Sequence, residues 1–171
     1  MSEWNPAVVD PIVAWRVWRV EEDERSGLLF LHSIHYGIRW PRRKPMRAHC
    51  IEQWRRGRMN PYPQAHQAPS GAGTHACGIY ALKEMEGTNS WLATAGTNAT
   101  KAIGRVSLWG RIALHEGGYR AEFAYPLDLL LLQPTPEGVD AEEVASLLAD
   151  AYGVPARAGL PAYSRVSRSG V

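Results

Sequence analysis

The sequence predicts a mainly β protein of the α+β class, in which a small, curved antiparallel sheet or barrel carries one amphipathic helix near the C-terminus. Three features support this prediction: a long alternating segment with a Gly-Gly pair, several shorter apolar runs of strand length, and one segment of helical periodicity. With 171 residues, the chain is long enough to bury a core without disulfide bonds. We expect one domain over residues 12–155, an N-terminal arm over 1–11 and a flexible tail over 156–171.

The segment 103–126 predicts a long β-hairpin with an apolar face and a polar face. On its first strand, apolar or small residues take every second position (Val106, Leu108, Gly110, Ile112 and Leu114), and the residues between them are Arg105, Ser107, Trp109, Arg111, Ala113 and His115. A two-residue turn at Gly117-Gly118 would pair Glu116 with Tyr119, because glycine adopts a positive φ without steric cost. The polar face would carry Trp109, Arg111, His115, Glu116, Tyr119, Arg120 and Glu122.

Shorter strands are expected before this hairpin. The apolar runs 12–20 and 27–34 predict a first hairpin with a loop of about five residues. Residues 37–40 predict a third short strand, which ends at Pro41, and residues 75–83 predict a further one.

The segments between these strands predict loops. Residues 57–74 are rich in Pro, Gly, Gln and Ala, and residues 87–101 contain Asn, Gly and Thr at many positions, so we expect two long loops, the second of them flexible. Residues 48–56 allow a short helical turn.

The strongest helix signal lies at residues 140–152. Asp140 and Glu143 have the spacing of a capping box, and apolar residues follow at helical intervals at Val144, Leu147, Leu148, Ala151 and Tyr152. Gly153 stands where a helix ends with a left-handed residue. We therefore expect a helix that packs on the sheet.

The segment 39–58 is strongly basic and contains two tryptophans. Its one acid is Glu52, and its tryptophans are Trp40 and Trp54. Its cationic residues are Arg39, Arg42, Arg43, Lys44, Arg47, Arg55, Arg56 and Arg58. Clustered arginines neutralise phosphates and nearby aromatic rings stack on exposed bases, so this segment predicts binding to DNA or RNA. The alternative is a solvated loop that only improves solubility, since the net charge of the whole chain is just +2.

A structural zinc site is the second prediction. Cys50, His66, His75 and Cys77 could supply four ligands in a loop-rich region, with His49 as a substitute for His66. The spacing contains no Cys-x-x-Cys motif, so the alternative is that the cysteines are buried thiols and the histidines lie on the surface.

The polar hairpin face could instead carry chemistry. His115 and Glu116 are a possible acid and base, and an arginine beside them could hold an anion. A pairing of Arg111 with Glu122 would be more typical of a structural ion pair. No nucleophile motif or phosphate loop accompanies these residues in the sequence.

Three motifs resemble those of uncharacterised bacterial proteins that are frequent in actinobacteria and their phages. The motifs are residues 75–81 (HACGIYA), 106–110 (VSLWG) and 118–126 (GYRAEFAYP), and the resemblance extends over about residues 12–155. It implies that the four predicted zinc ligands correspond to a ligand-like Cys and His set. The predicted order of elements is also similar to that of PUA-like barrels, which bind nucleic acids.

These observations predict a non-enzymatic, cytoplasmic domain that is stabilised by zinc and binds nucleic acid, with a modified or extruded base held in an aromatic pocket formed by Trp15, Trp40 or Trp109. The first alternative is a small-molecule-binding protein or metal-assisted enzyme that uses the polar hairpin face. The second is a protein-interaction module. The sequence has no apolar run long enough to cross a membrane.

Overall fold

A computed structural model describes residues 10–48 and 77–159 of the chain. The strands are β1 (Ile12–Glu22), β2 (Leu29–Ser33), β3 (Met46–Arg47), β4 (Ile79–Leu82), β5 (Lys101–His115), β6 (Gly118–Pro126), β7 (Leu129–Leu132) and β8 (Ala156–Gly159). The helices are the 3-10 helix η1 (Met85–Thr88), α2 (Asn89–Thr94) and α3 (Ala141–Tyr152). The predicted α+β class with mainly β structure is therefore confirmed. No helix in the described ranges is long and apolar enough to cross a membrane.

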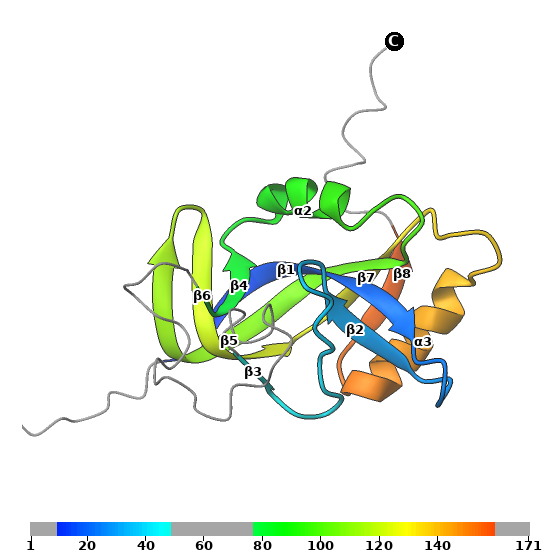
Figure 1. Ribbon diagram of the computed structural model, residues 1–171, viewed down its shortest axis with the longest axis horizontal. Coiled ribbons are helices and arrows are strands. Elements are labelled where there is room, and N and C mark those ends of the chain that lie inside the picture. Colours follow the sequence, from blue (N-terminus) through cyan, green and yellow to red (C-terminus); the bar gives the residue numbers. More distant parts are fainter. Residues whose placement is uncertain (1–9, 49–76, 160–171) are drawn as a thin grey trace, which may run out of the picture.

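All eight strands belong to one mixed sheet rather than to a regular barrel (Figure 1). Its order is β2-β1-β4-β6-β5-β7-β8, β3 pairs with β6, and β1 makes an additional pairing with β5. Every pairing is antiparallel except that of β7 with β8, which α3 connects in the chain. α3 packs against β2, β7 and β8.

The alternation of side chains in the central strands separates two hydrophobic clusters. In β1, Ala14 and Trp18 belong to the larger cluster, which also contains the buried residues of α3, whereas Val17 belongs to a smaller one. The smaller cluster includes Trp91 and Leu92 of α2. Each face of β1 therefore packs against its own helix.

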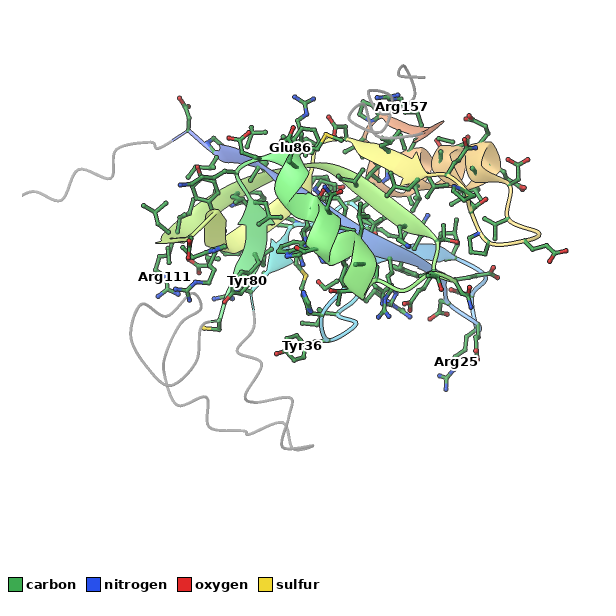
Figure 2. The ribbon with its side chains drawn as sticks, turned by 90° about the horizontal axis from the view of Figure 1, so that it is seen from above. Arg25, Tyr36, Tyr80, Glu86, Arg111 and Arg157 are labelled. Atoms are coloured by element: carbon green, nitrogen blue, oxygen red, sulfur yellow. The ribbon has the colours of Figure 1, made fainter. Side chains whose placement is uncertain are left out.

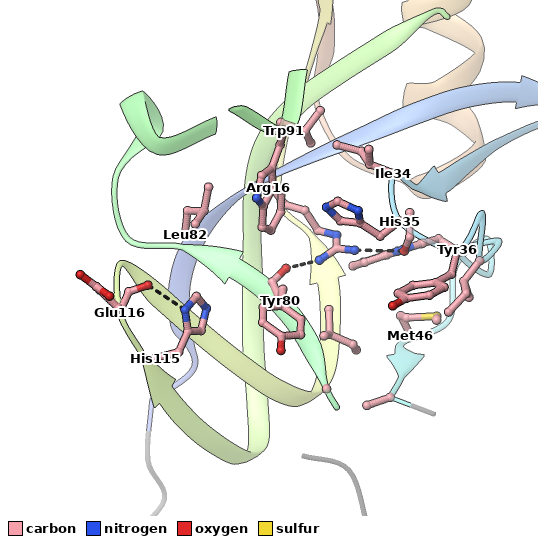
Figure 3. Close-up of a pocket in the computed structure, with 17 residues that line it drawn as sticks. Arg16, Ile34, His35, Tyr36, Met46, Tyr80, Leu82, Trp91, His115 and Glu116 are labelled. Carbon is pink, nitrogen blue, oxygen red and sulfur yellow. Dashed lines mark hydrogen bonds between the residues drawn. The ribbon is translucent and has the colours of Figure 1, made fainter. Parts of the chain in front are cut away.

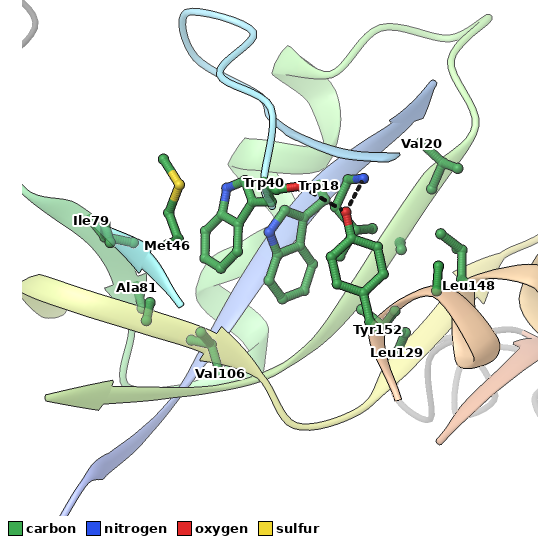
Figure 4. Packing of buried hydrophobic residues seen from close by; sticks show 14 of the residues in the cluster. Trp18, Val20, Trp40, Met46, Ile79, Ala81, Val106, Leu129, Leu148 and Tyr152 are labelled. Atoms are coloured by element: carbon green, nitrogen blue, oxygen red, sulfur yellow. Dashed lines mark hydrogen bonds between the residues drawn. The ribbon is translucent and has the colours of Figure 1, made fainter. Parts of the chain in front are cut away.

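The larger cluster is centred on two tryptophans and one tyrosine (Figure 4). The rings of Trp18 and Trp40 meet edge to face, with centroids 5.4 Å apart. The hydroxyl of Tyr152 accepts a hydrogen bond from the backbone N of Leu31 (2.8 Å) and donates one to the carbonyl of Trp40 (3.0 Å). One buried side chain thus ties α3 to β2 and to the segment that follows β2.

β1 leaves a gap in the sheet at residues 16 and 17. One edge of β1 pairs with β5 from Ile12 to Arg19. The other edge pairs with β2 from Trp18 onward and with β4 only at Trp15. Arg16 and Val17 therefore lie where the sheet opens between β2 and β4.

The central hairpin forms as predicted, but its predicted turn and register are wrong. The turn residues are Glu116 and Gly117, so His115 pairs with Gly118. Gly117 has the positive φ (+77°) that the turn requires. Gly118 is needed for a different reason, because a Cβ atom there would lie 2.1 Å from the carbonyl oxygen of Ala81 in β4. The second glycine therefore permits strand packing and does not form the turn.

A β-bulge interrupts the predicted alternation along β5. Trp109 pairs with Phe123 and Ile112 with Ala121, so two residues of β5 lie opposite Glu122. Gly110 occupies the bulge with φ +77°. Since Phe123 and Ala121 share a face of β6, Trp109 and Ile112 also share one, contrary to the prediction. Leu114, which was expected on the apolar face, is 72% exposed.

Three further elements can be compared with their predictions. The predicted helix is confirmed as α3, where the Asp140 side chain caps the backbone N of Glu142 and Glu143 and Gly153 ends the helix with φ +67°. The first hairpin is confirmed as β1 and β2. The predicted strand at 37–40 is reduced to a single bridge between His32 and Arg39.

Two predicted flexible segments contain regular structure. Residues 87–101 include α2, because the apolar side chains of Trp91 and Leu92 pack against the smaller cluster. Residues 156–159 of the predicted tail form β8, whose backbone pairs with β7. The predicted arm up to residue 9, the helical turn within 49–56 and the loop 57–74 lie outside the described residues.

Candidate functional site

A cavity of about 520 Å³ lies where the sheet opens beside β1 (Figure 3). Its described lining is Arg16, Val17, Ser33, Ile34, His35, Tyr36, Ile38, Trp40, Met46, Ala48, Gly78, Ile79, Tyr80, Leu82, Trp91, His115 and Glu116. The size is typical of a small-molecule or cofactor site. Five strands (β1 to β5), α2 and the segment after β2 therefore converge on one hollow.

Arg16 connects the two strands that border the opening. The residue is only 7% exposed. Its Nη1 donates a hydrogen bond to the carbonyl oxygen of Tyr80 in β4, and its Nη2 donates to Ser33 Oγ in β2 (3.0 Å). The guanidinium therefore replaces strand pairing at the position where β2 and β4 separate.

Two tryptophans contact the same guanidinium. Its carbon lies 5.0 Å from the centroid of the Trp40 ring and 5.8 Å from that of the Trp91 ring. Trp40 is held in place because its Nε1 donates to Ser33 Oγ (3.0 Å). The cavity consequently contains a cation within an aromatic environment.

The charge of Arg16 is not balanced by a described carboxylate. Burial lowers the pKa of Arg16 to about 9, so the group remains charged at neutral pH. Among the described lining residues, Glu116 is the only acid, and it is exposed on the hairpin turn. Nε of Arg16 is buried and has no hydrogen-bond partner within residues 10–48 and 77–159. A buried cation of this kind is costly unless a ligand supplies the missing acceptor.

Aromatic side chains also form the rim of the cavity. Tyr36 is 61% exposed and has φ +66°, an uncommon conformation for a bulky residue, in the turn that follows β2. Next to it, the His35 and Trp91 rings meet edge to face with centroids 6.1 Å apart. On the opposite side, the Tyr80 and His115 centroids are 5.2 Å apart. The rim offers several π-faces to a planar ligand.

The described cationic side chains of the basic segment do not line the cavity. Ile38, Trp40, Met46 and Ala48 line the cavity, whereas Arg39, Arg42, Arg43, Lys44 and Arg47 do not. Lys44 and Arg47 are exposed. Trp54, Arg55, Arg56 and Arg58 lie outside the described residues.

All four described arginines in this segment have structural contacts, including Arg47, whose guanidinium lies 5.8 Å from the Phe123 ring centroid. Arg39 forms an ion pair with Asp23 (2.6 Å), which lowers the pKa of the Asp23 carboxyl to about 2, chiefly through this hydrogen bond. Arg43 Nη2 donates to the carbonyl of Asp150 near the end of α3 (2.6 Å). The Arg42 guanidinium lies 5.7 Å from the Phe30 ring centroid. These residues are therefore held against the fold and are not freely extended chains.

The structure does not bring the predicted pocket residues of the hairpin together in one site. His115 lines the cavity, whereas Trp109, Arg111, Glu122, Tyr119 and Arg120 do not. The Trp109 and Phe123 rings stack with centroids 5.9 Å apart, and Arg111 Nε lies 3.3 Å from Glu122 Oε2. Lys83 Nζ lies 5.7 Å from the Tyr119 ring centroid, and Arg120 Nη1 donates to the carbonyl oxygen of Cys77 (3.2 Å). Trp15 lines a second cavity of about 420 Å³. Of the three tryptophans predicted for an aromatic pocket, only Trp40 lines the larger cavity, and of the predicted polar hairpin face only His115 and Glu116 line it.

Most of the described lining residues were not predicted as site residues, among them Arg16 and three residues that contact its guanidinium. Arg16 and Ser33 lie in the first hairpin, and Tyr80 is in β4. Trp91 lies in the segment that was expected to be a flexible loop. The one available signal was Arg16 itself, a charged residue within the apolar run IVAWRVWRV.

The predicted zinc site lies mostly outside the described residues. Cys50, His66 and His75, as well as His49, are in residues 49–76, while Cys77 is buried. Within the described ranges, no group of three His, Cys, Asp or Glu residues could hold a metal ion. Zinc stays a prediction, and metal analysis of the wild type against Cys77→Ala is expected to give less zinc in the variant.

Comparison with protein-family models, curated proteins and solved structures finds no match for this chain. The resemblance of its motifs to bacterial proteins thus stays a prediction. The functional inference for this chain depends on the geometry of the cavity and on the charges around it.

Proposed function

We propose that this protein is a binding domain that holds an extruded nucleobase of DNA or RNA in the cavity beside Arg16. The observation that carries this proposal is the combination of a hollow of about 520 Å³, two indole rings beside Arg16 in its wall, and the buried charge of Arg16 without a described counter-charge. Base-binding pockets combine stacking surfaces with hydrogen-bonding groups in this way.

The segment that runs from the end of β2 through β3 supports a nucleic acid over a free metabolite. Its apolar side chains line the cavity while Lys44 and Arg47 are exposed on the same short stretch. A base in the cavity would bring its own phosphates near these cations. The predicted zinc would bind in the region that follows Ala48.

The enzymatic alternative has less support. The predicted acid and base, His115 and Glu116, both line the cavity, but Arg111, the arginine expected to hold an anion beside them, forms an ion pair with Glu122. His115 Nδ1 donates to the carbonyl of Glu116 (2.8 Å), so it contacts a backbone oxygen and not a carboxylate. A catalytic histidine is usually oriented by a carboxylate, and His115 has no such contact among the described residues.

Binding of short labelled single strands of DNA and RNA at several salt concentrations tests the proposal. We expect affinity to fall as salt rises, with a slope that decreases by about 0.7 for each phosphate contact removed. The double variant Lys44→Ala/Arg47→Ala is expected to weaken binding and to reduce this slope. Both residues are exposed, so folding should be retained.

A matched control removes two charges elsewhere. Arg25 and Arg157 are exposed, and Figure 2 shows them away from Tyr36 and Tyr80 at the cavity. Arg25→Ala/Arg157→Ala is expected to leave the slope close to that of the wild type. Binding that does not depend on salt, or equal losses in both double variants, would contradict the proposal.

A further inference from the structure

The donors of Arg16 indicate which edge of a ligand the cavity would meet. A guanidinium has five N–H donors and no acceptor. The bonds to Tyr80 and Ser33 use one N–H on Nη1 and one on Nη2. The Nε–H is buried within the fold, so the donors left for a ligand are the second N–H on each of these two nitrogens. A ligand in contact with this group must therefore present acceptors.

A purely structural role would not require this residue type. A connector between β2 and β4 needs two donors, and a neutral side chain could provide them. Arg16 instead places a full positive charge at a site that is 93% buried, as its 7% exposure implies, and pairs it with no described acid. Keeping a buried charge is unfavourable without a partner, so the partner is expected in the ligand.

The aromatic neighbours restrict the ligand further. The Trp91 ring lies 5.8 Å from the guanidinium carbon and is partly exposed, so a ligand that reaches Arg16 also meets this indole. The Trp40 ring, 5.0 Å from the same carbon, is 1% exposed and backs the guanidinium from the core. Planar heterocycles stack on indole faces. Among nucleobases, guanine presents the adjacent acceptors O6 and N7, and arginine binds this pair with two hydrogen bonds. Adenine presents an amino donor in place of O6.

We propose that Arg16 determines the specificity of the cavity and that the cavity selects a 6-oxopurine, the base type of guanine and hypoxanthine, over adenine. This inference rests on the proposed function, because it treats the ligand as a base. It adds that O6 and N7 of the purine accept hydrogen bonds from the remaining donors of Arg16.

The nucleosides inosine and adenosine provide a direct test, because their bases differ only at position 6, where an oxo group replaces the amino group, and in the proton that the oxo form carries on N1. Titration of the wild-type protein, followed by tryptophan fluorescence, is expected to show that inosine binds about 5- to 150-fold more tightly than adenosine. Guanosine should bind like inosine. Since nucleosides carry no phosphate, an anion effect cannot produce this preference. Equal affinities, or no binding of either nucleoside, would overturn the inference.

The variant Arg16→Met removes all the donors and keeps an apolar side chain in the cavity. We expect it to lower the affinity for inosine to that for adenosine, while adenosine binding changes little because stacking is retained. Circular dichroism and the melting temperature establish whether the variant is folded. Arg157→Met is the matched control, since that residue lies outside the cavity, and it should keep the preference. A folded Arg16→Met protein that still prefers inosine would assign the specificity to other residues.

Failure of this inference can be distinguished from failure of the proposed function. Salt-dependent binding of single strands without any purine preference would leave the proposed function intact and overturn the role of Arg16. A preference for inosine without binding to any single strand would support the role of Arg16 and make the protein a nucleoside-binding domain.

Discussion

The two helices beside the sheet differ in how firmly they are held. α3 has twelve residues, a side-chain cap at Asp140 and five buried residues. α2 has six residues, no buried residue and no cap from Thr88, whose hydroxyl donates instead to the carbonyl of Met85 (2.6 Å). Packing and caps provide most of the stability of a helix in a protein. α3 therefore stabilises the fold, whereas α2 is expected to open locally at low cost.

This difference matters because the cavity is built partly on the weaker helix. Trp91 of α2 lies against Arg16, while Tyr152 of α3 fixes the opposite side of the same sheet. Tyr152 is neutral and both of its hydrogen bonds are made within the fold. Arg16 is charged and retains unused donors. A buried polar group with all its partners is typical of structure, and one that lacks partners is typical of a binding site.

The largest expected effect is the loss of a core side chain from α3. Leu148 is completely buried in the larger cluster. Leu148→Ala should lower the free energy of unfolding by about 2–5 kcal/mol, as measured by urea denaturation. Leu147, one position away on the same helix, is 49% exposed, and Leu147→Ala is expected to cost much less. Similar losses in the two variants would show that α3 does not pack as described.

The next effect concerns the hydroxyl of Tyr152. Tyr152→Phe leaves the backbone N of Leu31 and the carbonyl of Trp40 without this partner, so we expect a loss of about 1–3 kcal/mol at pH 7. Oligonucleotide binding at neutral pH should be unchanged, because Tyr152 does not line the cavity. A variant as stable as the wild type would contradict the structural role of this hydroxyl.

Alkaline pH should reduce the difference in the free energy of unfolding between the wild type and Tyr152→Phe. Burial raises the pKa of Tyr152 to about 12 in the folded state, while the unfolded value is about 10. Between these values the unfolded chain loses the proton first, so the wild type loses stability as pH rises through this window. Tyr152→Phe has no such proton to lose. Urea midpoints of the two proteins at pH 7 and pH 11 are therefore expected to converge, and a constant difference would count against the shifted pKa.

A smaller effect is expected from the cap of α3. The Asp140 carboxylate accepts hydrogen bonds from the backbone N of Glu142 (2.9 Å) and of Glu143 (3.2 Å). Asp140→Ala should cost about 0.5–2 kcal/mol in urea denaturation. Asp140→Asn is the matched control, since asparagine also caps helices and should retain most of the stability. Equal losses in both variants would assign the effect to the charge of Asp140.

The contrast between α3, which is capped and well packed, and α2, which is neither, also explains which parts of the fold could be predicted from the sequence. The signals for α3 are local: a cap, a helical repeat and a terminal glycine within fourteen positions, from Asp140 to Gly153. The hairpin was predicted from its alternation, but its register depends on β4, which approaches Gly118 from a distant part of the chain. α2 has neither a cap nor a full helical repeat. It forms because Trp91 and Leu92 find apolar partners on the sheet.

The cavity could not be predicted because its residues are brought together by sheet pairing. Arg16 and Tyr80 are 64 positions apart, and no local pattern relates them. Trp40 was predicted as a stacking residue for its place in the basic segment, and it lies at the cavity because that segment turns back along β2. Of the cationic residues in the basic segment 39–58, those up to Arg47 lie within the described residues. The sequence thus indicated residue types suited to a base, but not the strand opening that collects them.

The smallest expected effect on global stability comes from weakening α2. Ala93 is exposed in α2 and Ala149 is half-buried in α3. Each change to glycine disfavours its own helix by about 1 kcal/mol, a factor of roughly five. If α2 opens locally, Ala93→Gly should speed amide exchange within α2 by about this factor without moving the urea midpoint, whereas Ala149→Gly should lower the midpoint itself. Bound inosine should slow exchange in α2, because Trp91 contributes to the cavity. Equal shifts of the urea midpoint in both variants would mean that α2 unfolds only together with the whole domain. The part of the cavity formed by α2 would then be as stable as the rest of the fold.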